Sequence, residues 1–453
     1  MRQAVRAHGP ALLFEKIRGY SGWRIVGGIF AGLERIKLAL GVEELESVGW
    51  RIVSALWRQP PLTLREKFSS MAKVFEMGSY APRRARRAVF EENVIEAARI
   101  DDLRRLLPGI RQYPKEPNPY LTYPLVILEH PETRTFTMSV YRVMVRERDL
   151  VVHWQLHKRG RMAHLEWVER REEAPIAIAL SADPASLLAG ASPVPYPMDK
   201  FLFAGVLRGE GIELFKLDNG VMVPASSEVV IEGYVTSETA EEGPFGDHWG
   251  YYDKPARRFP VVRVERIWLR SNPVLYVTSV GKPVLEDAYI GKMVERVFLP
   301  LLRTIMPEIV DINLPPEGVF QGIAIVSIRK LYPGHAKKVM LGLFGLGMLA
   351  LTKIIIVVDH DINVHNIGEV LWAVAAHVDP QRDVVVIPHS HTDELDPATP
   401  IPGYGSKLGI DATRKLPEEY GGREWPEEVS VPKEIVEKVR EVLLREGVLR
   451  GTS

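Results

Sequence analysis

Two carboxylates flank a short, stiff turn near the middle of the chain. Glu242 and Asp247 lie on either side of Gly243-Pro244-Phe245-Gly246 within "ETAEEGPFGDHWGYY". Proline fixes φ and glycine tolerates positive φ, so such a turn holds its two ends at a set separation. Two acids held in this way suit general acid catalysis, because a neighbouring like charge or arginine moves their pKa values apart. The motif alone leaves a solvated acidic loop as an equal alternative.

Basic residues elsewhere supply counter-charge to these acids. Arg142 in "SVYRVMV" interrupts an apolar strand pattern, where a buried guanidinium needs a carboxylate partner. Lys407 lies in the Gly/Ser-rich segment "GYGSKLGIDAT", a kind of turn that binds phosphate. A third group lies together in "HWQLHKRGR": His157, Lys158, Arg159 and Arg161. Together these residues predict an anionic ligand that faces a carboxylic acid.

Two other patterns give weaker indications. Gly342, Gly345 and Gly347 in "LGLFGLGM" resemble a dinucleotide-binding loop, but they lie inside a helix that precedes a strand. A phosphate-binding glycine loop follows a strand instead, so close helix packing is favoured. His389 and His391 in "IPHSHTDELD" resemble a metal pair, but histidines two residues apart without cysteine favour ordinary surface or loop histidines.

The composition narrows the class of protein. The chain has 453 residues, of which 46% are hydrophobic and 26% charged, and this predicts two or three packed units. The formal net charge is zero, which argues against bulk attraction to nucleic acid or a membrane surface. Cysteine is absent, which excludes disulfides, thiolate metal sites and a cysteine nucleophile. Sparse Asn and Gln with abundant Glu, Arg and Lys are typical of proteins from hot environments.

The order of secondary structure predicts an α/β (α+β) protein. Residues 1–110 alternate short helical and strand patterns, residues 111–286 read as antiparallel strands, and a helix begins at Asp287 as its N-cap and ends before Pro307. Residues 307–453 alternate strands and helices and end in the amphipathic "VPKEIVEKVREVLL", which docks on this chain or on a partner. No signal peptide is recognised, and Lys353 interrupts the longest apolar tract, which predicts a buried helix and strand in a cytoplasmic enzyme.

At this point the residues resemble a known family. "GPALLFEKIRGYS", "SVYRVMV", "EEGPFGDHWGYY", "VVDHDINVHN" and "GYGSKLGIDAT" are similar to segments of UbiD-type decarboxylases, which use prenylated FMN to remove carboxyl groups from unsaturated acids. The resemblance implies a small N-terminal α/β unit over residues 1–110 and a split β-barrel that binds the flavin over residues 111–286. It also implies a linker helix over 287–306 and a C-terminal α/β oligomerisation domain over 307–453, with a terminal docking helix.

The resemblance also implies roles for individual residues. Arg142 would orient the substrate carboxylate and contact the flavin, Glu242 would donate the proton that replaces CO2, and Asp247 would support Arg142. The implied cofactor-binding residues are Arg142, His157, Ser192, Pro193, Lys200 and Lys407. Lys407 would bind the cofactor phosphate, and His157 would lie at the metal and phosphate site.

The metal site departs from the family pattern. In the family a divalent cation, Mn or Mg, bridges the flavin phosphate and is held by an Asn, a His and a Glu. Here the Asn and Glu positions are Thr137 and Lys200. Two readings remain open: the Lys200 ammonium replaces the metal, and any accompanying potassium, as counter-charge, or a one-residue shift places Asp199 at the Glu position and keeps the metal.

The substrate is implied less specifically. The chain looks like the archaeal branch of the family, which includes the decarboxylase that converts trans-anhydromevalonate 5-phosphate to isopentenyl phosphate in a modified mevalonate pathway of isoprenoid biosynthesis. Lys158, Arg159 and Arg161 would accept the phosphate tail. An aromatic acid decarboxylase or reversible carboxylase, acting on a hydroxybenzoate or polyprenyl-hydroxybenzoate, is the alternative.

Other classes of function also stay open. The chain could be a flavin-binding assembly subunit or an ordinary FMN reductase, although neither uses paired acids. The family's partners would be a flavin prenyltransferase that supplies the cofactor and a second copy of the chain in a homodimer or higher oligomer.

Overall fold

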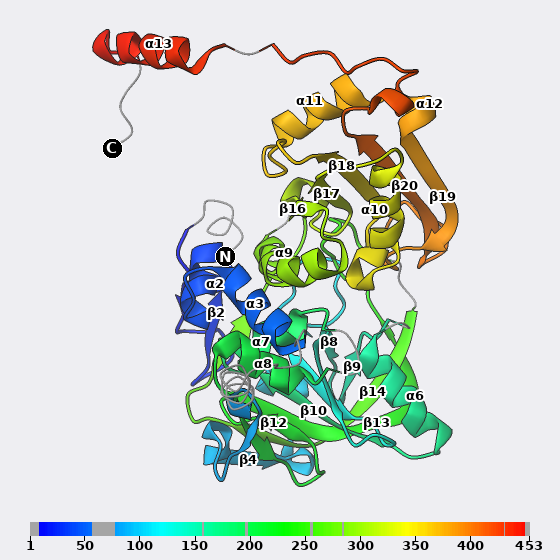
Figure 1. The fold of residues 1–453 in the computed structure, drawn as a ribbon. Coiled ribbons are helices and arrows are strands. Elements are labelled where there is room, and N and C mark those ends of the chain that lie inside the picture. Colours follow the sequence, from blue (N-terminus) through cyan, green and yellow to red (C-terminus); the bar gives the residue numbers. More distant parts are fainter. Residues whose placement is uncertain are drawn as a thin grey trace, which may run out of the picture.

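The computed structural model describes residues 9–56, 78–155, 158–194, 198–253, 257–282, 285–429 and 431–448. Figure 1 shows the central strands at one end of the molecule and the C-terminal strands at the other, with helix α9 (Glu286–Ile305) between them. The terminal helix α13 (Lys433–Arg445) stands apart from both.

The N-terminal part is a small α/β unit. Strands β1 (Leu12–Phe14) and β2 (Arg24–Gly27) pair antiparallel, and β15 (Val274–Val277) joins β2 in parallel. Helices α2 (Leu33–Leu40) and α3 (Leu45–Leu56) follow, and α3 packs on α9. The two helices approach closely at Gly49, where a Cβ would lie 2.2 Å from the Val297 carbonyl oxygen.

The centre of the molecule is a nine-stranded antiparallel sheet. Its order is β5-β8-β9-β14-β13-β10-β6-β7, and β4 pairs with β14. The strands are β4 (Asn93–Glu96), β5 (Tyr120–Leu121), β6 (Leu125–Glu129), β7 (Phe136–Val140), β8 (Val143–Val145), β9 (Asp149–Val152), β10 (Ala174–Leu180), β13 (Val229–Glu242) and β14 (Arg257–Leu269). The antiparallel prediction is confirmed, but the described strands do not close into a barrel, because β5 and β7 remain edges.

Both faces of this sheet are covered. In β6, Leu125 and Ile127 face one hydrophobic core, whereas Val126 and Leu128 face another. This double burial explains why the sequence there is continuously apolar rather than alternating.

Short helices and strands surround the central sheet. Asp183 caps α7 (Pro184–Ala191) by accepting from the Ser186 amide at 3.0 Å. The other elements are α5 (Leu103–Leu106), α6 (Arg159–Glu169), α8 (Lys200–Arg208) and the small sheet of β3 (Arg83–Arg84), β11 (Glu213–Lys216) and β12 (Met222–Pro224), with short 3-10 turns at Val89–Glu92 and Ala97–Arg99.

The predicted connecting helix is α9, which begins one residue before Asp287. Asp287 lies in the first turn, where its carboxylate accepts from the Leu285 amide at 3.0 Å, so it is not the N-cap. Among the helices that the structure describes, none is long and apolar enough to cross a membrane.

The C-terminal domain has a five-stranded mixed sheet. The order is β16-β17-β18-β20-β19, with parallel pairing of β17, β18 and β20 and antiparallel edges. The elements are β16 (Ile309–Asn313), β17 (Ile323–Ile328), α10 (His335–Phe344), β18 (Ile354–Asp359), α11 (Ile367–His377), α12 (Pro380–Asp383), β19 (Val384–His391) and β20 (Tyr404–Ala412), with 3-10 turns at Pro316–Gly318, Gly347–Leu351 and Pro417–Glu419. The predicted buried helix followed by a strand is therefore α10 and β18.

Of the three glycines, only Gly342 lies within α10 and serves packing as predicted; Gly345 is the C-cap of the helix, and Gly347 begins the following 3-10 turn with nothing from the described residues within 4 Å of a Cβ placed there. A Cβ at Gly342 would lie 2.3 Å from Cε of Met306, next to α9. His389 and His391, in turn, lie on β19 as exposed residues, and His389 stacks on Tyr404.

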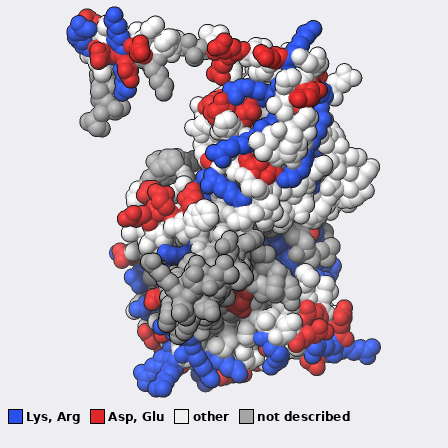
Figure 2. All heavy atoms as spheres, in the orientation of Figure 1, with Lys and Arg blue, Asp and Glu red and all other residues white. Residues whose placement is uncertain are grey.

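Helix α13 exposes an apolar face. Ile435, Val436 and Val439 are each about half exposed, at 51%, 50% and 50%. Figure 2 shows acidic and basic side chains intermingled on this helix, with no extended surface of one sign.

Candidate active site

A cavity of about 250 Å³ lies between the central sheet and the C-terminal domain. The central part contributes most of its lining, and the C-terminal domain closes it with Gln321, Leu351, Asp393 and Leu395. The central residues are Gln112, Thr122, Val140, Tyr141, Arg142, His153, Gln155, Lys158, Phe245, Asp247, His248, Thr278 and Val280. Two of the three predicted catalytic residues, Arg142 and Asp247, therefore face one cavity.

Arg142 is the cation that contacts the buried carboxylates of the site. It lies in the break between β7 and β8 rather than inside a strand. Its Nε and Nη2 donate to the two carboxylate oxygens of Glu242, each at 2.9 Å, and Nη2 also contacts Asp253. The Phe245 ring lies 4.3 Å from the guanidinium carbon. This arrangement fixes the guanidinium on one side of the cavity.

Glu242 is buried and held as a carboxylate. It ends β13 and is 1% exposed. Burial alone would raise its pKa, but the Arg142 charge and a 2.8 Å hydrogen bond with Nδ1 of His153 hold the pKa well below the usual range. A carboxylate that stays ionised at neutral pH is a poor proton donor.

Asp247 has the opposite electrostatic environment. It is 3% exposed, and burial raises its pKa to about 6, against the lowering effects of His248 and of the Trp249 amide that donates to Oδ1 at 2.8 Å. Asp247 is therefore the acid of the pair whose pKa is closer to neutral pH, as a proton donor requires.

The roles that the resemblance implies stay a prediction, but the contacts in this structure favour the reverse division between the two acids. Glu242 is the carboxylate that supports Arg142, and Asp247 has the environment of a proton donor. The second partner of Arg142 is Asp253, which also accepts from the Phe245 amide at 2.8 Å and so ties the turn to the arginine.

The sequence analysis did not identify His153 and Asp253. Both lie in segments that it quoted or adjoined, but their pattern did not separate them from ordinary strand and turn residues. With Glu242 they form a His/Glu/Asp group whose ligand atoms lie within 4.8 Å of one another. The Arg142 guanidinium already contacts both carboxylates there, so an arginine takes the position that a metal would need.

A second group of cations lies at the N-terminal end of α6. Lys200 is 5% exposed, and its ammonium donates to Ser139 Oγ and the Gly190 carbonyl, each at 2.9 Å. Burial, and then the charges of Arg159 and Lys158, lower its pKa to about 7. The nearby Thr137 hydroxyl is buried and has no partner within the described residues. Clustered positive charge at a helix N-terminus fits a phosphate group.

The structure opposes Asp199 as a metal ligand. Its Oδ1 caps α8 by accepting from the amides of Phe201 and Leu202, at 2.7 and 3.0 Å. This use of Asp199 leaves Lys200 as the inward-facing residue at the family's Glu position.

The remaining residues that were predicted to bind the cofactor or the substrate phosphate lie in different positions. Lys158 lines the cavity, whereas Arg159 donates to the Met198 carbonyl at 3.1 Å and Arg161 contacts His164 at 2.9 Å. Ser192 is buried at the end of α7, where its hydroxyl donates to the Leu188 carbonyl at 2.8 Å, and the partly exposed Pro193 follows it. His157 lies outside the described residues.

Lys407 lies behind the wall of the cavity. Its ammonium is 3% exposed and donates to the carbonyls of Ala350 and Thr352, at 2.6 and 3.0 Å. These two residues flank Leu351, which lines the cavity. In this structure the ammonium therefore bonds to backbone carbonyls behind the cavity wall, and the phosphate-binding role that the resemblance implies stays a prediction.

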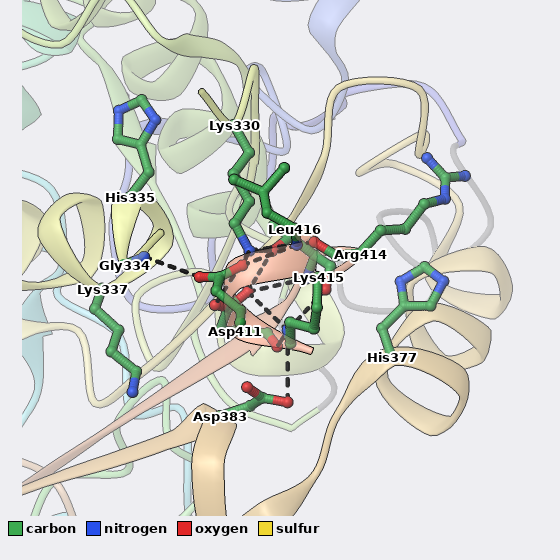
Figure 3. Close-up of polar contacts among 12 residues, drawn as sticks. Lys330, Gly334, His335, Lys337, His377, Asp383, Asp411, Arg414, Lys415 and Leu416 are labelled. Atoms are coloured by element: carbon green, nitrogen blue, oxygen red, sulfur yellow. Dashed lines mark hydrogen bonds and ion pairs between the residues drawn. The ribbon is translucent and has the colours of Figure 1, made fainter. Parts of the chain in front are cut away.

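A separate charged cluster lies in the C-terminal domain, beyond the ends of β17 and β20 (Figure 3). Lys415 contacts Asp411 at 3.2 Å and Asp383 at 3.5 Å, and Lys330 contacts Glu419 at 2.5 Å. A cavity of about 310 Å³ adjoins these acids. Because the cations and carboxylates are already paired, we assign this cluster a structural role.

Comparison with known proteins identifies the family. The 3-octaprenyl-4-hydroxybenzoate carboxy-lyase models match in three parts: the N-terminal domain over residues 1–52, the Rift-related domain over 83–283 and the C-terminal domain over 288–412. An uncharacterized protein of Aeropyrum pernix is 56% identical over 437 residues, which cover 96% of this chain and 89% of the relative.

Solved structures agree with this match. The vanillic acid decarboxylase of Sedimentibacter hydroxybenzoicus in closed form has a TM-score of 0.82 at 28% identity, covering 97% of this chain and 92% of that one. Its open form has a TM-score of 0.74 at 27% identity, covering 98% and 92%. The UbiD-class enzyme HmfF of Pelotomaculum thermopropionicum in complex with FMN has a TM-score of 0.76 at 27% identity, covering 93% and 88%. With three family models matched in order along most of its length, this chain belongs to the UbiD family of carboxy-lyases.

Proposed function

We propose that this protein decarboxylates trans-anhydromevalonate 5-phosphate to isopentenyl phosphate and CO2 with prenylated FMN as its cofactor. One observation carries the proposal: an arginine, an acid with a raised pKa and a lysine line the same cavity, as Arg142, Asp247 and Lys158. These are the groups that an unsaturated acid with an anionic tail requires.

Arg142 would bind the carboxylate that leaves. Its contacts with Glu242 and Asp253 use Nε and Nη2, which leaves Nη1, as far as the described residues are concerned, for the substrate. Because the guanidinium is already fixed, little side-chain entropy is lost when substrate binds.

Asp247 would supply the proton that replaces CO2. The carboxylate leaves as CO2, its bonding electron pair stays on the substrate carbon, and Asp247 transfers its proton to that carbon before solvent reprotonates it. The prenylated flavin, when bound, supplies the electron sink that makes loss of CO2 possible.

The cofactor phosphate would bind at the N-terminal end of α6. Arg159 and Lys200 lie there, and the Lys200 ammonium would act as the counter-charge that a divalent cation supplies elsewhere in the family. The replacement of two oxygen ligands by Thr137 and Lys200 supports this assignment, because hard cations require several oxygen ligands. Lys158, which faces the cavity, would then bind the substrate phosphate.

An aromatic acid is the second candidate substrate. The solved structure of a vanillic acid decarboxylase covers 97% of this chain, and the reaction of that enzyme uses an acid without a phosphate tail. Carboxylation in the reverse direction belongs to the same candidate.

The assembly would be a homodimer or higher oligomer with a closing cavity. The exposed apolar face of α13 supports self-association, and an evolved form of HmfF is dimeric in complex with prFMN. The greater likeness to the closed than to the open form of the vanillic acid decarboxylase supports a closed arrangement here.

A flavin prenyltransferase would supply the cofactor, and an archaeal, thermophilic and cytoplasmic setting accords with the composition.

The experiment is a substrate panel on protein co-expressed with a flavin prenyltransferase. Trans-anhydromevalonate 5-phosphate, its unphosphorylated analogue, a hydroxybenzoate and a cinnamate are compared by CO2 release. We expect turnover of the phosphorylated acid at least tenfold above the others. Preferred turnover of an aromatic acid would keep the decarboxylase class and reject the substrate.

A further inference from the structure

The acid Asp247 is attached to the C-terminal domain through the two residues that follow it. The Trp249 amide donates to Asp247 Oδ1 at 2.8 Å, and the Trp249 indole Nε1 donates to Asp393 Oδ2 at 3.3 Å. One residue therefore holds the catalytic carboxyl with its backbone and the C-terminal domain with its side chain.

The Trp249 ring is enclosed by the C-terminal domain on other sides. The Lys353 ammonium lies 5.1 Å from the ring centroid. A Cβ at Gly322 would lie 3.1 Å from the indole, so the glycine is what allows the ring to approach. Lys353 also forms an ion pair with Asp396 at 2.8 Å. The ring therefore packs on a part of the domain that this ion pair stabilises.

His248 makes the same connection beside Trp249. Its Nε2 lies 2.8 Å from Gln321 Nε2 and 3.6 Å from Asp393, and Gln321 also contacts Asp393. Asp393 is 3% exposed and is the point where these contacts meet. His248, Gln321 and Asp393 line the cavity together with Asp247.

We propose that Asp393 and Trp249 are positioning residues that place the proton donor Asp247, so that the contact between the C-terminal domain and the turn completes the acid site. This inference rests on the proposed acid role of Asp247. It extends that role, because the donor would be correctly placed only while the C-terminal domain is seated on the turn.

A neighbouring ion pair provides a matched control. Glu394 follows Asp393 directly and also joins the two domains, through Arg257 Nη1 at 3.1 Å. Arg257 does not lie on the turn that carries Asp247. Glu394→Gln therefore weakens an interdomain contact without removing a support of the acid.

The first test is hydrogen exchange on the full-length protein, which is independent of activity. In Asp393→Ala and Trp249→Phe, we expect the amides of residues 245–250 to exchange at least tenfold faster than in wild type. Glu394→Gln is expected to leave this segment unchanged. Should Asp393→Ala fail to fold, as judged by circular dichroism, Trp249→Phe carries the test alone.

The second test is kinetic, on the cofactor-loaded enzyme. We expect kcat to fall at least tenfold in both variants, with KM changed by less than threefold and the alkaline limb of the pH profile displaced. The double variant is expected to lose little more than either single variant, because both act through one contact.

Unchanged exchange in residues 245–250, or equal effects of Glu394→Gln and Asp393→Ala, would overturn the inference. Failure of the proposed function gives a different result: loaded wild type would then form no product, and undiminished turnover by Asp247→Asn would reject the acid role, whatever the exchange data show.

Discussion

The Arg142 guanidinium donates two parallel hydrogen bonds to the Glu242 carboxylate, each 2.9 Å long. This bidentate pair commits Glu242 to the ionised form and to the support of Arg142. The pKa of Asp247, five residues further along, is instead raised to about 6 by burial.

Substitution of each acid should therefore give a different kinetic defect. We expect Asp247→Asn to lower kcat about 10²- to 10⁴-fold and to abolish the alkaline limb near pH 6, because the donor is lost. Glu242→Gln should lower kcat/KM about tenfold to a hundredfold but keep that limb. The pH dependence of both constants distinguishes the two, and a limb lost in Glu242→Gln alone would assign the acid to Glu242.

The raised pKa of Asp247 should also appear in stability. Burial raises the folded pKa from 3.8 to about 6, so the contribution of Asp247 is fully present below about pH 4 and is lost as pH rises through 6. We expect Asp247→Asn to gain stability relative to wild type from pH 4 to pH 8, by on the order of 2 kcal/mol. Denaturant unfolding across this range measures the difference, and a constant difference would contradict the raised pKa.

Lys200 should make cofactor binding independent of a divalent metal. We expect purified holoprotein to contain less than about one metal ion in ten chains and to keep its flavin after EDTA treatment. Lys200→Met should lower flavin content at least tenfold, while the Lys407→Met control, which changes a lysine placed behind the wall, should lower it less. Elemental analysis and flavin absorbance measure these quantities. Stoichiometric Mn or Mg in wild type would reject the replacement.

Lys158 should bind the substrate phosphate rather than the cofactor. We expect Lys158→Met to raise KM for the phosphorylated acid about tenfold to a hundredfold, with little change for an unphosphorylated analogue. Flavin content should stay within twofold of wild type. Equal effects on both substrates would show instead that Lys158 acts on the shared carboxylate end or on the fold.

The helix pair that joins the N-terminal unit to α9 should be sensitive at Gly49. A methyl group there would lie 2.2 Å from the Val297 carbonyl and 2.8 Å from the Pro300 ring, and neither is a flexible side chain. We expect Gly49→Ala to destabilise the protein by about 2 kcal/mol. Gly41 and other glycines that have open space around them are not suitable controls for this substitution. Gly342→Ala, which meets the flexible Met306, is the milder control. Equal thermal stability of wild type and Gly49→Ala would contradict this close approach.

The sequence allowed much of the fold to be predicted. The apolar stripe of α9, the antiparallel centre and the alternating C-terminal elements follow from local periodicity, and periodicity depends on neighbouring residues only. Closure of the central sheet could not be predicted, because whether β5 meets β7 depends on twist and curvature over nine strands.

The site was predicted in composition but not in detail. Arg142 and Asp253 are 111 residues apart in the chain, and periodicity carries no information over that distance. The roles of Glu242 and Asp247 depend on which of them the guanidinium contacts, which only the folded structure fixes. Lys407 illustrates the same limit: a lysine in a glycine-rich segment looks available for phosphate, but here backbone carbonyls occupy its ammonium.

The most direct measurement is formation of isopentenyl phosphate from trans-anhydromevalonate 5-phosphate by prenylated-FMN-loaded wild type and Asp247→Asn, measured side by side. We expect one isopentenyl phosphate for each CO2 with wild type and at least a hundredfold slower formation with Asp247→Asn at equal flavin content. Absence of product with loaded wild type would contradict the substrate, and undiminished turnover by Asp247→Asn would contradict the assignment of the acid.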